Sequence, residues 1–242
     1  MQSITKLPPT DGIEPATGDL DGWVLESAEN SDVGGRLNAG ATSLRLGDDA
    51  TNKQYRSILS FITSSLPDNA VLTKVSLKLR RQGVIGGGDV VTIFQGLMLD
   101  LRKGTFGTAA LQPTDWQAAA SKTVGPITPT LASGWYIVDL TTSRAYINKL
   151  TTSGGLTQIR LRFKLDDNNN ALANYLSLYS GNAPAAESAA VRLNRAACSK
   201  KQRPRSKCRS ESSCGSLVIS VSGIRSANSV TKIFSVEQAF LD

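Results

Sequence analysis

The run Asp166-Asp167-Asn168-Asn169-Asn170 places five oxygen-bearing side chains in consecutive positions. Carboxylate and amide oxygens are the hard ligands that calcium prefers. The run lacks the glycine and the distant glutamate of an EF-hand, so a calcium ion here would be structural. We expect its ligands to be Asp166, Asp167, Asn168 and Asn170, with Asp19, Asp21 or Asp48 as long-range partners. An ordinary polar turn with Asx hydrogen bonds is the alternative.

Histidine is absent from all 242 residues. This removes the usual general base at neutral pH, the commonest zinc ligand, and the partner that a Ser or Cys nucleophile needs in a triad. Chemistry with paired carboxylates remains compatible with the composition. The carboxylates of Asp48, Asp49, Asp166 and Asp167 fall in turns, however, without a motif that would place two of them across a cleft. We therefore expect a protein that is not an enzyme.

Period-two alternation is the dominant pattern, and it predicts strands with one buried face. Val75, Leu77 and Leu79 alternate with polar residues, and Ile159 to Leu165 alternates in the same way with Arg160, Arg162 and Lys164. We expect these three cations on a solvated face, or on a surface that binds an anionic ligand. The predicted core contains Ile58, Leu77, Leu79, Ile93, Leu161, Phe163 and Leu178.

Further strands are expected where β-branched, aromatic and leucine residues gather between turn signals. They cover residues 43–46, 55–61, 90–101, 135–140 and 175–179, and short helices are expected at 113–122 and 142–149. This rhythm predicts an all-β fold: one antiparallel β-sandwich, jelly-roll-like, over residues 15–186. Residues 1–14 form an N-terminal segment.

The C-terminal tail, residues 187–242, differs from the rest in charge and cysteine content. Residues 1–186 carry 17 Lys or Arg against 16 Asp or Glu, whereas the tail carries 10 against 4. Cys198, Cys208 and Cys214 all lie in the tail and match no zinc pattern. We expect a basic segment with little order. Nucleic-acid binding by the tail is a third option that we do not favour, because charge alone supplies affinity without specificity.

A frameshift is one explanation of the tail. Glu187 to Arg195 can be written in codons whose shifted frame spells Asn-Arg-Pro-Gln-Phe-Val-Leu-Ile, and the family resemblance given below implies a last strand that begins in this way. The hypothesis is that residues 187–242 are a frameshifted translation. The alternative is a genuine basic tail in which Leu217 to Ile224 supplies the last strand. The nucleotide sequence of the gene decides between them.

Export signals and membrane spans are not recognisable in the sequence. No stretch approaches the ~20 apolar residues of a transmembrane helix, and Met1 to Thr10 lacks the apolar core of a signal peptide. If the domain is exported, its signal lies outside this chain.

The chain resembles the DNRLRE-type domain, a jelly-roll-like module of exported bacterial and archaeal proteins. The resemblance covers residues 19–186, and the six-letter string that names the family is absent. It is carried by Asp21-Gly22-Trp23-Val24, Leu44 to Asp48, Tyr55 to Phe61 with Ser64-Ser65-Leu66-Pro67, and Arg160 to Phe163 with the Asp166 run. It implies a non-catalytic β-sandwich similar to carbohydrate-binding modules, some relatives of which bind acidic polysaccharides such as alginate.

Carbohydrate binding would use aromatic rings, because an apolar face with a polar edge suits a sugar ring. The candidates are Trp23, Trp135, Tyr136 and Tyr179, with Arg160, Arg162 and Lys164 to meet the carboxylates of an acidic polysaccharide. This hypothesis requires rings and cations to cluster on one face or at one end. The alternative is a structural or adhesive spacer in an extracellular or cell-surface protein, without a specific small ligand.

Overall fold

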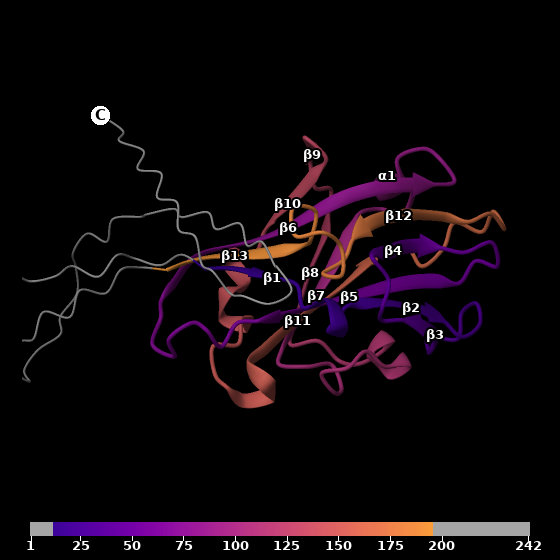
Figure 1. The fold of residues 1–242 in the computed structure, drawn as a ribbon. Coiled ribbons are helices and arrows are strands. Elements are labelled where there is room, and N and C mark those ends of the chain that lie inside the picture. The colour runs from indigo at the N-terminus through magenta and orange to yellow at the C-terminus, as the bar shows by residue number, and fades with distance from the viewer. Residues whose placement is uncertain (1–11, 196–242) are drawn as a thin grey trace, which may run out of the picture.

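The computed structural model describes residues 12–195 and shows an all-β protein, as predicted (Figure 1). Every strand pairing among these residues is antiparallel, and together the strands form one 13-stranded sheet curled into a half-barrel. The strands are β1 (Gly12–Pro15), β2 (Gly22–Glu26), β3 (Gly34–Asn38), β4 (Ser43–Asp48), β5 (Gln54–Ile62), β6 (Leu72–Ile85), β7 (Leu97–Lys103), β8 (Lys122–Ile127), β9 (Leu131–Ala132), β10 (Trp135–Asp139), β11 (Leu156–Phe163), β12 (Asn174–Tyr179) and β13 (Ala190–Arg195).

Strand β6 joins the two halves of the sheet. It is 14 residues long and runs along much of the molecule (Figure 1). Its first part pairs with β10 and β13, and its last part pairs with β12. One half therefore contains β1, β13, β6, β10 and β9, while β12, β4, β5, β11, β7 and β8 continue the other half, with β2 and β3 attached to β5.

The main core lies between these two halves. Leu77 and Leu79 of β6 face Leu161 and Phe163 of β11 across it, and all four side chains are fully buried. Strict alternation explains why: each strand turns every second side chain inward. The predicted core residues Ile58 and Leu178 are also buried.

Ile93 corrects the predicted core. Its side chain is 38% exposed because residues 90–93 form a short helix, α1 (Val90–Ile93), and not the start of a strand. The Asp89 side chain caps this helix by accepting a hydrogen bond from the Val91 backbone N–H at 3.2 Å. Strand β7 begins only at Leu97.

The other short helices are 3₁₀ turns. They are Gly18–Leu20, Pro113–Trp116, Thr141–Tyr146 and Thr152–Gly155, so the helices expected at 113–122 and 142–149 exist but are shorter. None of the helices within residues 12–195 has the length and apolar character needed to span a membrane.

A second apolar layer covers the outer face of β5 and β11. Residues 104–121, which we call the covering segment, place Phe106, Leu111 and Trp116 against Val24 and Ile58. This part of the sheet is consequently buried on both faces.

The sheet extends beyond the expected boundary at residue 186. Val191 and Leu193 of β13 pair with Leu77 and Val75 of β6, and both are buried in the main core. Strand β1 pairs with β13 in turn, so the domain reaches from residue 12 to residue 195. The low-order tail expected over 187–242 is thus corrected in its first part, since residues 190–195 form a strand and alternate inward and outward like any other strand. Residues 196–242, with the cysteines and the strand expected at 217–224, lie outside the described residues.

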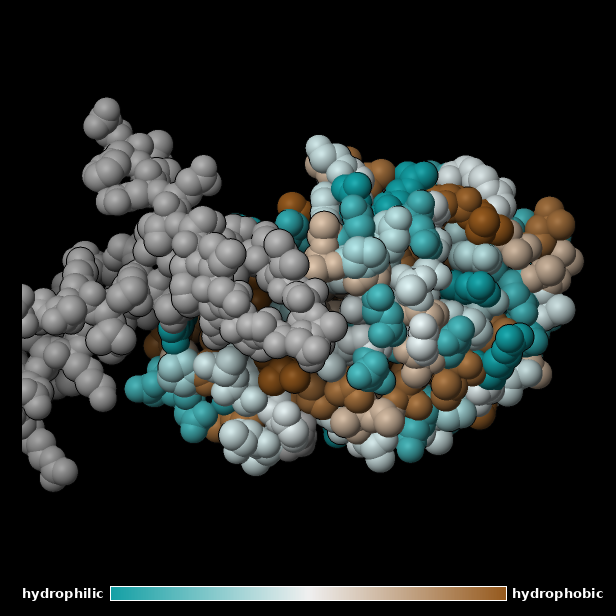
Figure 2. Space-filling view, viewed as in Figure 1, coloured by the Kyte–Doolittle hydropathy of each residue, from teal (hydrophilic) through white to brown (hydrophobic). Residues whose placement is uncertain are grey.

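Surface apolar residues are dispersed. Figure 2 shows hydrophobic residues at several separate places among hydrophilic ones on the visible face. Scattered exposure of this kind is normal and does not by itself indicate a binding site.

Candidate functional site

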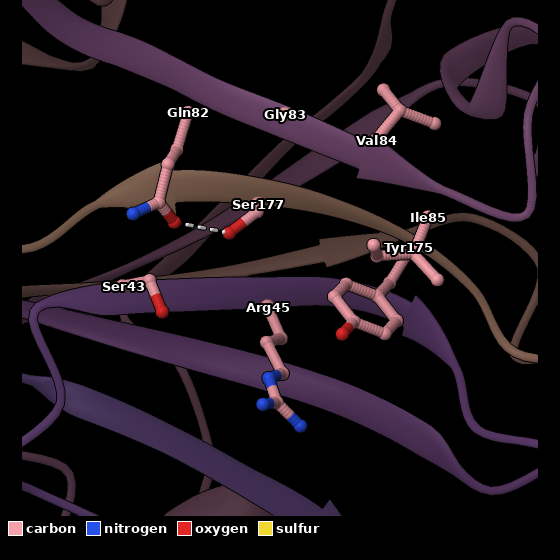
Figure 3. Close-up of a pocket in the computed structure, with 8 residues that line it drawn as sticks. All are labelled: Ser43, Arg45, Gln82, Gly83, Val84, Ile85, Tyr175 and Ser177. Carbon is pink, nitrogen blue, oxygen red and sulfur yellow. Dashed lines mark hydrogen bonds between the residues drawn. The ribbon is translucent and has the colours of Figure 1, made fainter.

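A groove of about 310 Å³ lies on the outer face of β4, β12 and the end of β6 (Figure 3). Alternation produces it: Leu44 and Leu46 of β4 and Leu176 and Leu178 of β12 point into the core, and their neighbours point outward. The lining residues are Ser43, Arg45, Gln82, Gly83, Val84, Ile85, Tyr175 and Ser177.

A register shift shapes the middle of this groove. The pairing of β12 with β6 shifts between Ser177 and Leu178, and Gln82 lies in the shifted stretch of β6. Bulges of this kind re-aim side chains. The Ser177 hydroxyl donates a hydrogen bond to Gln82 Oε1 at 2.6 Å (Figure 3). Beside them, a Cβ added at Gly83 would meet no atom within 4 Å. The groove therefore presents an amide, a hydroxyl and open space.

Arg45 is the cation of the groove, and three aromatic rings hold it. Its Cζ lies 5.1 Å from the Trp23 ring centroid, 5.4 Å from that of Tyr55 and 5.1 Å from that of Tyr175. Nη1 also donates to the Tyr55 hydroxyl at 3.1 Å. These contacts fix the position of the guanidinium through cation–π attraction.

No carboxylate forms an ion pair with Arg45 in the described part of the chain. A guanidinium has five N–H donors in a planar fork that matches a carboxylate. Arg45 thus combines a fixed position, a half-buried side chain and unused donors. This arrangement can bind an anionic group that enters the groove.

The predicted aromatic residues lie in three different places. Trp23 is buried behind Arg45, and Tyr179 points outward from β12 beside Ser43, so both belong to the surroundings of the groove. Trp135 lies on the outer face of β10, in the other half of the sheet. Tyr136 points into the core, where burial raises the pKa of its hydroxyl.

Two of the three predicted cations, Arg160 and Arg162 of β11, do not lie on a solvated face, because the covering segment shields it. Arg160 is only 5% exposed. Its Nε and Nη2 donate to Asp100 Oδ2 at 3.0 and 2.8 Å, and Nη1 donates to the carbonyls of Asp115 and Ala118. Arg162, half-buried, donates from Nε to the same Asp100 oxygen at 3.1 Å. Lys164 is exposed and bonds Gln95.

The carboxylate of Asp100 offsets the positive charges of Arg160 and Arg162 in this cluster. Burial alone would raise the pKa of Asp100, but a hydrogen bond from Thr123 and the two guanidiniums outweigh burial and lower it. Arg56 stacks on Trp116, with its Cζ 3.3 Å from the ring centroid. Burial, with repulsion from Arg160 and Arg162, lowers the pKa of Arg56 to about 9. These cations anchor the covering segment.

The oxygen-rich run is organised by Asx hydrogen bonds. The side-chain oxygens of Asp167, Asn168 and Asn170 accept backbone N–H groups two residues ahead, at 2.7, 3.3 and 2.8 Å. Within residues 12–195 no group of three or more His, Cys, Asp or Glu gathers as for a metal. Asp166, at the start of the run, is exposed. Calcium binding therefore stays a prediction. The hydrogen bonds of the run are those expected for the alternative, an ordinary polar turn.

Of the three expected long-range partners, Asp48 reaches the run. Its carboxylate is buried and accepts the backbone N–H groups of Asn168 and Asn174 at 3.1 and 3.0 Å. Burial raises its pKa to about 6 despite these bonds. Asp21 lies elsewhere, bonded to the backbone of Ser60 and Gly181.

Arg45, Gln82 and Ser177 were not among the predicted site residues. The alternation in Ser43 to Leu46 does indicate that Arg45 faces outward, but nothing local indicates which rings surround it. The three rings come from β2, β5 and β12.

Comparison with known proteins adds no relative: no family model matches the chain, and no curated protein matches it either. The resemblance to the DNRLRE-type domain is neither supported nor contradicted by these comparisons. It stays a prediction that rests on the residues quoted above.

Proposed function

We propose that this domain is a non-catalytic carbohydrate-binding module that holds an acidic glycan in the groove of β4, β6 and β12. The observation that carries the proposal is Arg45, a half-buried cation fixed by three rings without a carboxylate partner in residues 12–195. An exported or cell-surface protein is the setting in which such a module would act.

Each part of the groove has a role in this proposal. The Arg45 fork binds the sugar carboxylate, since charge-assisted bidentate bonds are strong and orientation-specific. Tyr175 offers part of a ring to the apolar face of the sugar. The Gln82 amide and the Ser177 hydroxyl lie within the same groove and bind sugar hydroxyls.

The test is the affinity of the full chain for a polyuronate, measured by calorimetry. Arg45→Gln should weaken binding by about tenfold or more, because it removes a charge-assisted contact. Arg45→Lys should recover only part of the loss, since an ammonium lacks the planar fork. Tyr175→Ala should also weaken binding.

The matched control is Arg144→Gln, which removes the same charge from an exposed 3₁₀ turn remote from the groove. If Arg45→Gln and Arg144→Gln both bind like the unaltered chain, the proposal is wrong. A chain that binds no glycan at all would instead favour the structural or adhesive spacer.

A further inference from the structure

A second hollow, of about 620 Å³, lies on the outer face of the other half of the sheet, on β10, β6 and β13. The inner faces of both halves cover the same core, so this face points away from the Arg45 groove. Figure 1 shows the three strands side by side. The lining residues are Thr73, Lys74, Ser76, Lys78, Ile137, Asp139, Arg192 and Asn194.

Cations dominate this face. Lys74, Lys78 and Arg80 occupy alternate outward positions of β6, and Arg192 of β13 lies directly opposite Ser76. Arg80 is neutralised by Glu187, with Nε and Oε2 2.6 Å apart. Asp139 is near Lys74 and is held by Thr141.

Lys78 lies among these cations and pairs with no carboxylate in the described part of the chain. Its Nζ lies 4.6 Å from the Trp135 ring centroid, and it forms no hydrogen bond or ion pair with any residue in the range 12–195. Burial and the nearby Arg192 lower the pKa of Lys78. An anion that binds beside the Lys78 ammonium would therefore favour its charged form.

Two occupants from the same protein do not fit this face. The sequence that continues from β13 is itself basic, with six Lys or Arg and no Asp or Glu in residues 196–210. A second copy docking by the same face would place cations against cations. Charge complementarity therefore requires an anionic partner.

The polar side chains indicate which anion. The Trp135 ring is already approached by Lys78 and Arg80, so it is not free to stack on nucleic-acid bases. Thr73, Ser76 and Asn194 line the hollow among the cations, with Thr73 exposed and the other two side chains buried at its floor. This mixture suits a polymer that carries hydroxyls between its charges.

We propose that the outer face of β10, β6 and β13 is a second binding surface, for a linear anionic polysaccharide, separate from the Arg45 groove. For the ligand class it rests on the proposed function. Because the two surfaces point away from each other, one domain can bind two polysaccharide chains at once and link them.

The test compares the double variant Lys74→Gln/Lys78→Gln with Lys103→Gln/Lys122→Gln. The control removes the same charge from exposed positions on β7 and β8. The probes are dextran sulfate, a polyuronate, neutral dextran, and a single-stranded oligonucleotide. We expect the first variant to lose about fivefold or more in affinity for the anionic polysaccharides, and the control little. Neutral dextran should not bind.

Labelling of lysines by an amine reagent provides a readout on the unaltered chain: bound polysaccharide should protect Lys78 and leave Lys122 reactive. Cross-linking of polysaccharide chains by the protein should raise the light scattering of their mixture. This scattering should be lower for Arg45→Gln and for the Lys74/Lys78 variant, since each removes one of the two binding surfaces.

Three results would overturn the inference: equal loss in both double variants, no protection of Lys78, or tighter binding of the oligonucleotide than of either polysaccharide. Loss of binding in Arg45→Gln with an unaffected Lys74/Lys78 variant would refute this surface and leave the proposed function intact. The reverse pattern would refute the groove and support this surface.

Discussion

Asp100 neutralises the buried cations on the face of the sheet that the covering segment covers. It is the only carboxylate within residues 12–195 that pairs with Arg160 and Arg162. A buried cation whose partner is removed is left uncompensated, and this is far more costly than the pair is favourable. The cluster therefore acts as a fixed anchor and not as a surface for ligands.

Asp100→Asn should lower the free energy of unfolding by about 3–5 kcal/mol, because it leaves two guanidiniums without a counter-charge. Urea denaturation measures this. Thr123→Val is the matched control, since it removes one hydrogen bond to the same carboxylate, 2.6 Å long, and should cost about 1 kcal/mol. A loss below about 1 kcal/mol in Asp100→Asn would show that water reaches these cations.

Asp48 gives the fold a pH dependence of unusual sign for a carboxyl group. Its pKa is raised by burial from the model-compound value of 3.8 to about 6 in the folded protein. A raised pKa means that the folded state binds the proton more tightly than the unfolded state. The resulting stability is fully present below pH 3.8 and is lost as the pH rises through 6. Burial also raises the pKa of Asp21 well above its ordinary value, in the same direction.

We therefore expect the thermal midpoint to rise as the pH falls from 7.5 to 5, and Asp48→Asn to flatten this rise. The carboxyls with lowered pKa, Asp49, Asp100 and Asp139, oppose it only below about pH 4. Calcium bound to the run would lower the pKa of Asp48 and remove the trend, so the series is measured with calcium and with chelator. A midpoint that falls steadily from pH 7.5 to 5 with chelator would contradict the assignment.

At the scale of elements, the covering segment packs on the outer face of β5 and β11 and buries it as a second apolar layer. Trp116 is 1% exposed, stacks on Arg56, and packs with Val24 and Ile58. Trp116→Ala should cost about 3–5 kcal/mol, as for other buried large-to-small changes. Trp135→Ala, at a half-exposed ring, should cost clearly less. Chemical denaturation followed by circular dichroism measures both, and equal costs would mean that the covering segment is not a packed layer.

Sequence patterns predicted those elements whose signal is local. The alternation around Leu77 and Leu161 identified strands with a buried face, and both residues are fully buried. The same alternation wrongly placed Arg160 in water, because it reports which side chains share a face and not what covers that face. The covering segment is irregular, so its packing on β11 has no periodic signal. The site around Arg45 was not predicted for a similar reason, because the three rings that hold the guanidinium come from three separate strands.

At the scale of the whole molecule, β6 holds the two halves together, and β13 completes the side of β6 that does not pair with β10. Val191 and Leu193 cover part of the main core, and β1 is held in the sheet through β13. Losing β13 would leave an unpaired edge beside an uncovered apolar face, which favours aggregation. The stability of the domain should therefore depend on residues 190–195 and not on the sequence after them.

Two truncated chains test this dependence. A chain ending at Arg195 should unfold at the same urea midpoint as the full chain, because it keeps every pairing of β1, β6 and β13. A chain ending at Ala186 should be strongly destabilised and should aggregate. The point variant Leu193→Ala, in the full chain, should cost about 2–5 kcal/mol and serves where the shorter chain does not fold. If the chain ending at Ala186 is as stable as the other two, β13 is dispensable and the domain ends where its sequence resemblance ends.

If residues 187–242 come from a frameshift, the strand they supply is a substitute, and restoring the frame should raise the midpoint above that of the present chain.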